Sequence, residues 1–233
     1  TVQNTLGVQA VHPVPAELVG EQMQAVMEDL RPDAIKIGMT GNVEIISEIA
    51  RLLHQYSPRQ VVLDPVMVST SGHNLMTDEA VEAICTLLLP EVSLVTPNLH
   101  EAAVLLQQPI HTVDDMEYAA HLVYEKYHCA CLVKGGHLTG NEMCDVLYDG
   151  HELHLFGARR IHSGNLHGTG CTLSSAIATF LAQGFPLYEA VELAKTYITK
   201  AIEAGKDLHI GQGNGPLCHF PYLVNPVNPL TEE

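Results

Sequence analysis

Basic residues are scarce in this 233-residue sequence. Lys and Arg together number 11, against 27 Asp and Glu, which gives a formal net charge of −16. This excess of negative charge disfavours binding to nucleic acids and to anionic membrane surfaces, so neither is expected as a partner. A phosphate-bearing ligand would need a positive field that is local or supplied by a metal.

Long apolar segments are lacking too. The sequence has no apolar run of about 18 residues and no secretory signal pattern, so we expect a cytoplasmic protein with reduced thiols and no membrane span. The six cysteines include Cys129 and Cys131, but no second pair and no ordered histidine spacing accompany them. We expect these two to be buried strand residues and not zinc ligands.

Short apolar runs alternate with helical patterns along most of the chain. Strands are predicted at residues 34–38, 61–64, 92–96 and 130–134, and helices at residues 16–30, 43–55, 78–89, 99–106 and 113–127. Such alternation is typical of parallel strands joined by helical crossovers. The sequence therefore predicts a three-layer α/β/α sandwich with a mostly parallel central sheet.

The pattern changes after the last of these strands. Residues 143–148 and 151–156 flank Asp149-Gly150, the dipeptide of a type I′ turn, which predicts an antiparallel hairpin at the edge of the sheet. Two further helices are predicted, over residues 171–181 and 187–204. Both helices follow the hairpin in the sequence.

The two ends of the chain differ from the middle. Residues 1–12 read as the end of a strand whose start is absent. No internal repeat or linker divides the sequence, so we expect one domain over residues 1–220. Residues 221–233 form a proline-rich tail in which regular structure is not expected.

Acidic and amide side chains follow two of the predicted strands. Ligands of such sheets bind beyond the carboxyl ends of the strands, where Asp64, Asn98 and Glu101 are found. Two carboxylates and an amide oxygen suit Mg²⁺, held through waters and shared with phosphate oxygens. The alternative is that Asn98 caps the following helix, with Glu101 as its capping-box partner.

Lys134 ends another strand and is followed by Gly135-Gly136, which places a cation where phosphates could bind. Its alternative is an exposed lysine at the end of a strand. Residues 135–141 have the glycine spacing of a P-loop, but Asn141 stands where that motif requires lysine. A P-loop ATPase is therefore not predicted, and the third glycine of a dinucleotide-binding fingerprint is missing as well.

The stretch Gly168-Thr169-Gly170-Cys171 precedes an apolar helical run. Free backbone N–H groups and the positive end of the helix dipole make such a junction an anion site. The alternative is a tight turn with Cys171 packed beneath it. A helix N-terminus can lower a thiol pKa to roughly 3.5–7.5, so Cys171 is the candidate base, although nearby phosphates would oppose the shift. Together with the carboxylates and Lys134, this anion site predicts phosphoryl transfer.

Seven short motifs follow one another across residues 1 to about 220. They are Gln3-Asn4-Thr5, Lys36-Ile37-Gly38-Met39, Val62-Leu63-Asp64-Pro65-Val66-Met67, Thr96-Pro97-Asn98-x-x-Glu101, Val133-Lys134-Gly135-Gly136-His137, His167-Gly168-Thr169-Gly170-Cys171-Thr172 and Ile210-Gly211-Gln212-Gly213-Asn214-Gly215-Pro216. In this order they resemble the ribokinase-like superfamily, and specifically the hydroxymethylpyrimidine/phosphomethylpyrimidine kinases of thiamine biosynthesis.

The resemblance implies ATP-dependent phosphorylation of 4-amino-5-hydroxymethyl-2-methylpyrimidine, and then of its monophosphate, with Mg²⁺. It places Cys171 at the position of the family's base and Gly168, Thr169, Gly170 and Cys171 at its anion hole. By the same matching, Asp64 and Glu101 take the metal positions, Asn98, Glu101 and Lys134 the ATP and phosphate positions, and Gln3, Met39 and Val66 the pyrimidine pocket.

Two alternatives stay open. Most sugar kinases of the superfamily have aspartate where Cys171 stands, so the cysteine favours the vitamin-kinase branch, which also contains pyridoxal kinases. A pyridoxal kinase is therefore one alternative, and a catalytically silent ligand-binding relative is the other. The family normally starts with a strand and a turn before the motif at Gln3, and we expect this segment to be missing here. We also expect a homodimer.

Overall fold

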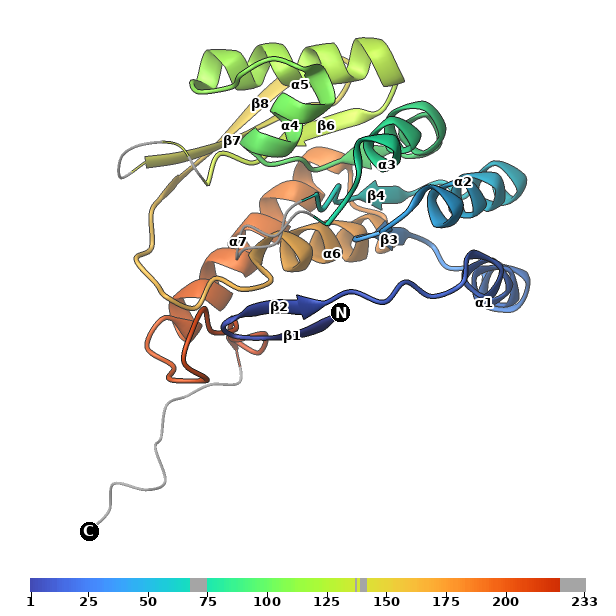
Figure 1. Ribbon diagram of the computed structural model, residues 1–233. Coiled ribbons are helices and arrows are strands. Elements are labelled where there is room, and N and C mark those ends of the chain that lie inside the picture. The colour runs from blue at the N-terminus through green and yellow to red at the C-terminus, as the bar shows by residue number, and fades with distance from the viewer. Residues whose placement is uncertain (68–74, 137, 139–141, 223–233) are drawn as a thin grey trace.

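A six-stranded sheet organises the fold in the computed structural model, which describes residues 1–67, 75–136, 138 and 142–222. Its strands lie in the order β3 (Ile35–Ile37), β4 (Val61–Leu63), β5 (Leu94–Val95), β6 (Ala130–Val133), β7 (Glu142–Tyr148) and β8 (Leu153–Arg159) (Figure 1). The strands β3 to β6 are parallel, whereas β7 and β8 run antiparallel to their neighbours. The predicted sheet with its edge hairpin is confirmed.

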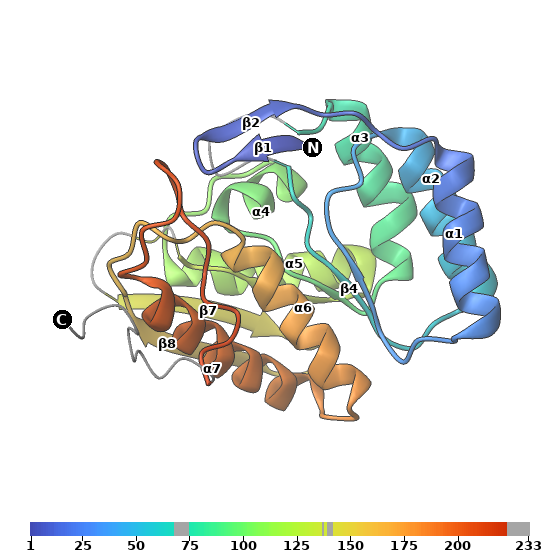
Figure 2. The ribbon, with the colours of Figure 1, turned by 90° about the horizontal axis from the view of Figure 1, so that it is seen from below.

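Helices cover both faces of this sheet. They are α1 (Ala16–Asp29), α2 (Val43–Tyr56), α3 (Asp78–Ala83), α4 (Leu99–Leu106), α5 (Val113–Tyr127), α6 (Thr169–Ala182) and α7 (Leu187–Gly205). Alternate residues of a strand face opposite sides, and accordingly Leu63 packs in the core cluster with α2 to α5, while Val62 packs in the cluster with α6 and α7. Figure 2 shows α6 and α7 side by side over their face. Within the described ranges, no helix is long and apolar enough to cross a bilayer.

The chain is helical over the predicted residues 78–89, but the type of helix changes within this range. The α-helix ends at Ala83, and the chain continues through a wider π-helical turn, η1 (Ile84–Leu88), and a 3₁₀ turn, η2 (Leu89–Glu91). Pro90 has no N–H to donate and its ring opposes a regular α-helical bond, so the α pattern cannot run to the end of this segment.

The predicted type I′ turn is also wrong. The Asp149 N–H donates to the Glu152 carbonyl (3.3 Å), so Gly150 and His151 are the two central residues of the turn. A type I′ turn needs positive φ at both central positions, and here only Gly150 has it (98°). Asp149 instead precedes the turn, where its Oδ1 accepts the N–H groups of His151 and Glu152.

The first residues form a hairpin and not a single strand end, contrary to the prediction. Strand β1 (Val2–Asn4) pairs antiparallel with β2 (Gly7–Ala10) in a two-stranded sheet separate from the central one. Figure 1 shows this hairpin below the central sheet, near the end of α7. The Oγ1 of Thr5, at its tip, accepts the N–H groups of Gln212 (3.2 Å) and Gly213 (3.3 Å). This contact fixes the hairpin to the segment that follows α7.

Candidate active site

Charged side chains from three segments meet at the carboxyl ends of the strands. Asp64 follows β4, Glu101 lies in the first turn of α4, and Lys134 follows β6. The Nζ of Lys134 lies 2.7 Å from Asp64 Oδ1 and 3.9 Å from Glu101 Oε2, and the three side chains are only 14%, 3% and 5% exposed. The alternative of an exposed strand-end lysine is therefore wrong, because the Lys134 side chain is largely shielded and pairs with Asp64.

Burial and charge act against each other in this cluster. Loss of water raises the pKa of Glu101 to about 7, although Lys134 and the backbone of Asn98 favour its ionised form. Burial also opposes the charge of Lys134, but the carboxylates of Asp64 and Glu101 outweigh it, so the pKa of Lys134 is raised. Lys134 therefore carries a fixed positive charge, while Glu101 can gain or lose a proton near neutral pH.

Asn98 and Glu101 form the capping box that was the alternative to a metal site. Asn98 Oδ1 accepts the Glu101 N–H (3.0 Å), and Glu101 Oε2 accepts the Asn98 N–H (2.7 Å), forming a reciprocal capping box at the start of α4. Capping fixes the Glu101 carboxylate beside Lys134. A role for Asn98 in phosphate binding stays a prediction.

Helix α6 begins two residues earlier than predicted, which brings the predicted anion hole into its first turn. Gly168 is the N-cap residue with φ 83°, and it supplies no side-chain cap. In the described part of the chain, the N–H groups of Gly170 and Cys171 have no hydrogen-bond acceptor. A Cβ at Gly170 would lie 3.2 Å from Lys134 Nζ and 3.7 Å from Asp64 Oδ2. A side chain at this position would crowd the ion pair, so glycine lets α6 start directly beside it.

The pKa of the Cys171 thiol is raised, although a helix N-terminus by itself would lower it. The residue as a whole is exposed, but surrounding atoms shield its thiol from water, which is the largest cause of the shift. The charge of Asp64 and its hydrogen bond with the thiol raise the pKa further, and the charges of Lys36 and Lys134 offset this only in part. In the ligand-free protein Cys171 is therefore a thiol at neutral pH.

Alkylation of the metal-free protein tests this state of Cys171. Because the thiolate is the reacting form, Cys171 should react with iodoacetamide more slowly at pH 7.5 than free cysteine, and its rate should keep rising above about pH 9. Asp64→Asn removes a charge that raises the pKa, so it should speed the reaction at pH 7.5. Site-resolved mass spectrometry measures both rates, and a wild-type rate that levels off below pH 8 would contradict the assignment.

A small cavity of about 240 Å³ adjoins Cys171. Gln3, Met39 and Val66 line it together with Gly168 and Cys171, and the β1–β2 hairpin supplies much of its wall. The volume is below the roughly 300–1,000 Å³ common for drug-sized ligands, so it suits a small ring. A larger groove of about 680 Å³ runs along α1 and β3, but Asp64, Lys134 and Cys171 do not line it.

Comparisons with known proteins decide the family. A family model described as phosphomethylpyrimidine kinase matches residues 1–218. The chain belongs to this kinase family. It is 50% identical over 222 residues to the hydroxymethylpyrimidine/phosphomethylpyrimidine kinase of Rhizobium meliloti, covering 94% of this chain and 83% of the relative. It is 39% identical to the enzyme of the same name from Escherichia coli, covering 94% and 82%.

Solved structures agree with this assignment. The phosphomethylpyrimidine kinase of Clostridium difficile has a TM-score of 0.76 at 40% identity, covering 86% of this chain and 82% of that chain. The pyridoxal kinase of Staphylococcus aureus in complex with ADP has a TM-score of 0.86 at 31% identity, covering 97% and 81%. The predicted ribokinase-like fold, the phosphotransferase class and the kinase function in thiamine biosynthesis are confirmed.

Most of the kinase's predicted site residues come together at one edge of the sheet, in the ion-pair cluster, the first turn of α6 or the small cavity. His137 of the fifth motif lies outside the described residues, as do residues 223–233 of the predicted tail.

Two residues that contribute to the site were given no role from the sequence. Lys36 is a lysine inside an apolar strand, and this break in the pattern could have marked it; its charge reaches Cys171.

Asn165 is the second missed residue, and it supports the turn that leads into α6. Its Nδ2 donates to the carbonyls of Gly205, the last residue of α7, and of Leu208 just beyond it, each at 2.7 Å. The residue is buried. Because these acceptors are about 40 residues away in sequence, no local pattern marks Asn165.

Asn165→Asp should destabilise the kinase by at least about 2 kcal/mol, because a carboxylate cannot donate to these carbonyls and would face them while buried. Urea unfolding measures the change. Asn42→Asp is a matched control, since Asn42 caps α2 by accepting the Ile45 N–H; aspartate caps as well as asparagine, so the change should stay within about 0.5 kcal/mol. Equal effects of the two substitutions would contradict the assigned role of Asn165.

Proposed function

We propose that this kinase transfers the γ-phosphoryl group of ATP to the hydroxymethyl group of 4-amino-5-hydroxymethyl-2-methylpyrimidine, and then phosphorylates the monophosphate, at the sheet edge described above. One observation carries the proposal. Cys171 lines the small cavity and also belongs to the first turn of α6, beside the pair of Asp64 and Lys134. An acceptor in that cavity would have its hydroxyl between a base and an anion site.

Cys171 is the general base in this proposal. In its thiolate form it takes the hydroxyl proton as the bond between the acceptor oxygen and the γ-phosphorus forms. The bond from that phosphorus to the ADP oxygen breaks, ADP leaves, and no covalent intermediate forms on Cys171. Lys36 and Lys134 favour its thiolate form, whereas Asp64 opposes it. Gln3, Met39 and Val66 hold the pyrimidine ring in the cavity.

The phosphates are bound by backbone and lysine groups. The N–H groups of Gly170 and Cys171, which have no acceptor among the described residues, form the anion hole for the transferring phosphoryl oxygens, with Gly168 and Thr169 shaping the turn. The N–H and hydroxyl of Thr169 both donate to the Leu166 carbonyl in the ligand-free protein. Lys134 lies next to this turn and neutralises negative charge on the ATP side, where Asn98 and Glu101 complete the site. Catalysis then rests on positioning and on charge neutralisation.

The donor groups fit a magnesium ion that is held mainly by the nucleotide. No group of three or more His, Cys, Asp or Glu side chains able to hold a metal occurs in the described residues, so the protein forms no closed cage there. Asp64 Oδ2 lies by Gly170, while Oδ1 accepts from Lys134. Asp64 and Glu101 can thus bind Mg²⁺ through waters, as is usual when phosphates supply the other ligands. Bound Mg²⁺ would neutralise the phosphates and the Asp64 carboxylate.

ADP release with each acceptor tests the proposal. We expect kcat/KM to be higher for the hydroxymethylpyrimidine than for pyridoxal, with release requiring Mg²⁺. A preference for pyridoxal would favour the alternative function, a pyridoxal kinase. The TM-score of 0.85 to a kinase solved in complex with pyridoxal supports this alternative. Pyrimidine binding in calorimetry without ADP release would indicate a silent relative. Sedimentation of the same sample tests the proposed homodimer.

A further inference from the structure

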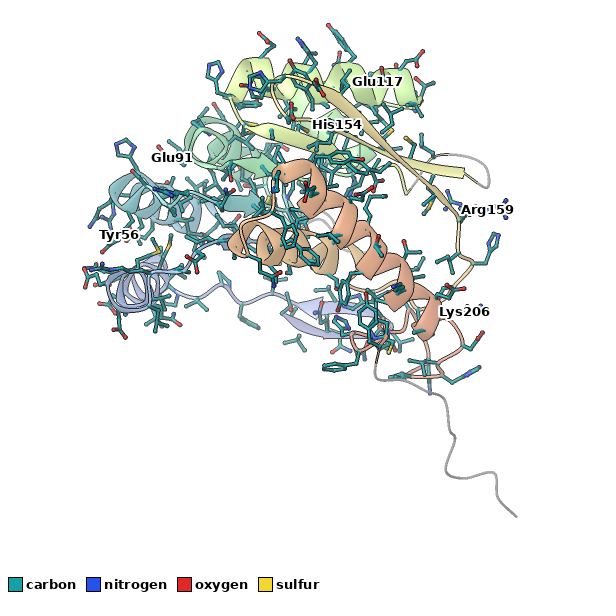
Figure 3. The ribbon with its side chains drawn as sticks, turned by 180° about the vertical axis from the view of Figure 1, so that it is seen from behind. Tyr56, Glu91, Glu117, His154, Arg159 and Lys206 are labelled. Atoms are coloured by element: carbon teal, nitrogen blue, oxygen red, sulfur yellow. The ribbon has the colours of Figure 1, made fainter. Side chains whose placement is uncertain are left out.

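A second buried ion pair lies on the α7 side of the sheet, outside the groups assigned above. Lys195 Nζ, from α7, is 2.5 Å from Asp145 Oδ2, from β7. The side chains are only 15% and 11% exposed. Figure 3 views the molecule from this side, with α7 lying in front of the sheet. A buried ion pair is seldom a net source of stability compared with apolar side chains, so this pair calls for another explanation.

The second carboxylate oxygen of Asp145, Oδ1, connects this ion pair to the candidate active site. Asp145 Oδ1 accepts the backbone N–H of Gly135 at 2.8 Å, and Gly135 directly follows Lys134. The turn is pressed tightly against β7, because a Cβ at Gly135 would lie 1.8 Å from the Cys144 carbonyl oxygen. Asp145 therefore joins α7 to the first residue after Lys134.

The same turn is fixed at other points. The Lys134 N–H donates to the Pro97 carbonyl at 2.8 Å. Arg160, which follows β8, donates to the carbonyls of Gly136 (3.1 Å) and Leu138 (2.6 Å). The bond from Asp145 is charge-assisted, as are the two from Arg160, and such bonds are stronger than neutral ones. The bond from Asp145 holds the backbone N–H of the residue next to Lys134. Lys195 pairs with the other oxygen of the same carboxylate.

We propose that Asp145, held by Lys195, is a positioning residue that fixes the Lys134–Gly136 turn for the nucleotide phosphates. The inference rests on the proposed function, in which Lys134 serves the ATP side. Loss of the Asp145 acceptor frees the Gly135 N–H and lets the turn leave the position from which Lys134 Nζ reaches Asp64 and the start of α6. The affected ligand groups are the β- and γ-phosphates, and not the pyrimidine.

Two double variants of the full chain isolate the acceptor from the charges. Asp145→Asn with Lys195→Met removes both charges but keeps a carbonyl oxygen for the Gly135 N–H. Asp145→Leu with Lys195→Met removes the charges and the acceptor while keeping the branched shape of the side chain at position 145. Because buried ion pairs are commonly replaceable by apolar side chains, both variants should fold. Single substitutions would leave a buried charge unpaired and are less informative.

Calorimetric titration with ADP, with a nonhydrolysable ATP analogue and with the pyrimidine distinguishes the variants. The Leu variant should bind both nucleotides about tenfold more weakly than the Asn variant, the size expected from one lost hydrogen bond. The two variants should bind the pyrimidine equally. Glu48→Ala, which removes an exposed ion pair with Arg51, should leave every affinity unchanged.

Equal nucleotide affinity of the two double variants would overturn the inference. Equal weakening of nucleotide and pyrimidine binding in the Leu variant would do so too, since it would indicate a general structural defect. If only one double variant folds, its nucleotide affinity is compared with that of the wild type. The inference then predicts an affinity near that of the wild type for the Asn variant, or one about tenfold weaker for the Leu variant. Absence of pyrimidine-dependent ADP release by the wild type would refute the proposed function, a result distinguishable from these.

Discussion

Cys171→Ala should lower kcat with the pyrimidine by about 10²–10⁴-fold, the loss expected when a general base is removed. The affinity for ATP should stay nearly unchanged, because the backbone N–H groups at Gly170 and Cys171 remain in the first turn of α6. Steady-state ADP release gives kcat, and calorimetry with a nonhydrolysable ATP analogue gives the affinity. A loss confined to kcat separates proton transfer from binding.

Two further variants control this experiment. Cys171→Ser keeps the size of the side chain but has a far less acidic hydroxyl, so it should be nearly as slow as the alanine variant. Cys218→Ala changes another partly exposed cysteine, and it should retain wild-type turnover. An unchanged kcat in Cys171→Ala would assign the residue to packing beneath the turn.

Lys134→Met should cost about 3–5 kcal/mol of unfolding free energy, because it removes one partner of a buried ion pair. The buried carboxylates of Asp64 and Glu101 would lose the cation that compensates their burial. Urea unfolding in the presence of EDTA measures this change without any contribution from a metal. The same variant should also lose most of its kcat/KM for ATP, since the cation on the phosphate side is gone.

Neutralising the partner provides the control for Lys134. Adding Asp64→Asn to Lys134→Met removes the uncompensated carboxylate, so it should recover part of the lost stability but none of the activity. Arg51→Met breaks a pair in which Arg51 is 55% exposed, and such surface pairs contribute only about 0–1 kcal/mol. A comparable loss in Arg51→Met and Lys134→Met would contradict the importance given to burial.

Local patterns in the sequence were sufficient to predict much of this fold. Apolar runs marked the buried strands, and the rule that ligands bind beyond strand ends placed Asp64, Glu101 and Lys134 at one edge. These inferences depend on spacing along the chain, which a sequence contains directly. The helix start after Gly168 was within two residues of the observed one.

Features that depend on through-space neighbours could not be predicted in the same way. The pKa of Cys171 is set by shielding and by Asp64, a residue more than 100 positions earlier in the chain, so the position of Cys171 at a helix N-terminus could not give the net direction of the shift. Asn165 and Asp145 act on backbone groups of other segments. The pairing of β1 with β2 and the wider turn after α3 likewise depend on packing and on Pro90, and not on apolar periodicity.

Protection of Cys171 by the acceptor tests the central claim most directly, because the claim is that the pyrimidine binds against this thiol. The wild-type protein is alkylated with iodoacetamide at pH 9 with increasing concentrations of the hydroxymethylpyrimidine, and modification is followed separately at Cys171 and Cys218. We predict that saturating pyrimidine slows alkylation of Cys171 at least about tenfold and leaves Cys218 unchanged, as expected for a thiol covered by a bound ligand. Equal rates at Cys171 with and without bound pyrimidine would contradict the account.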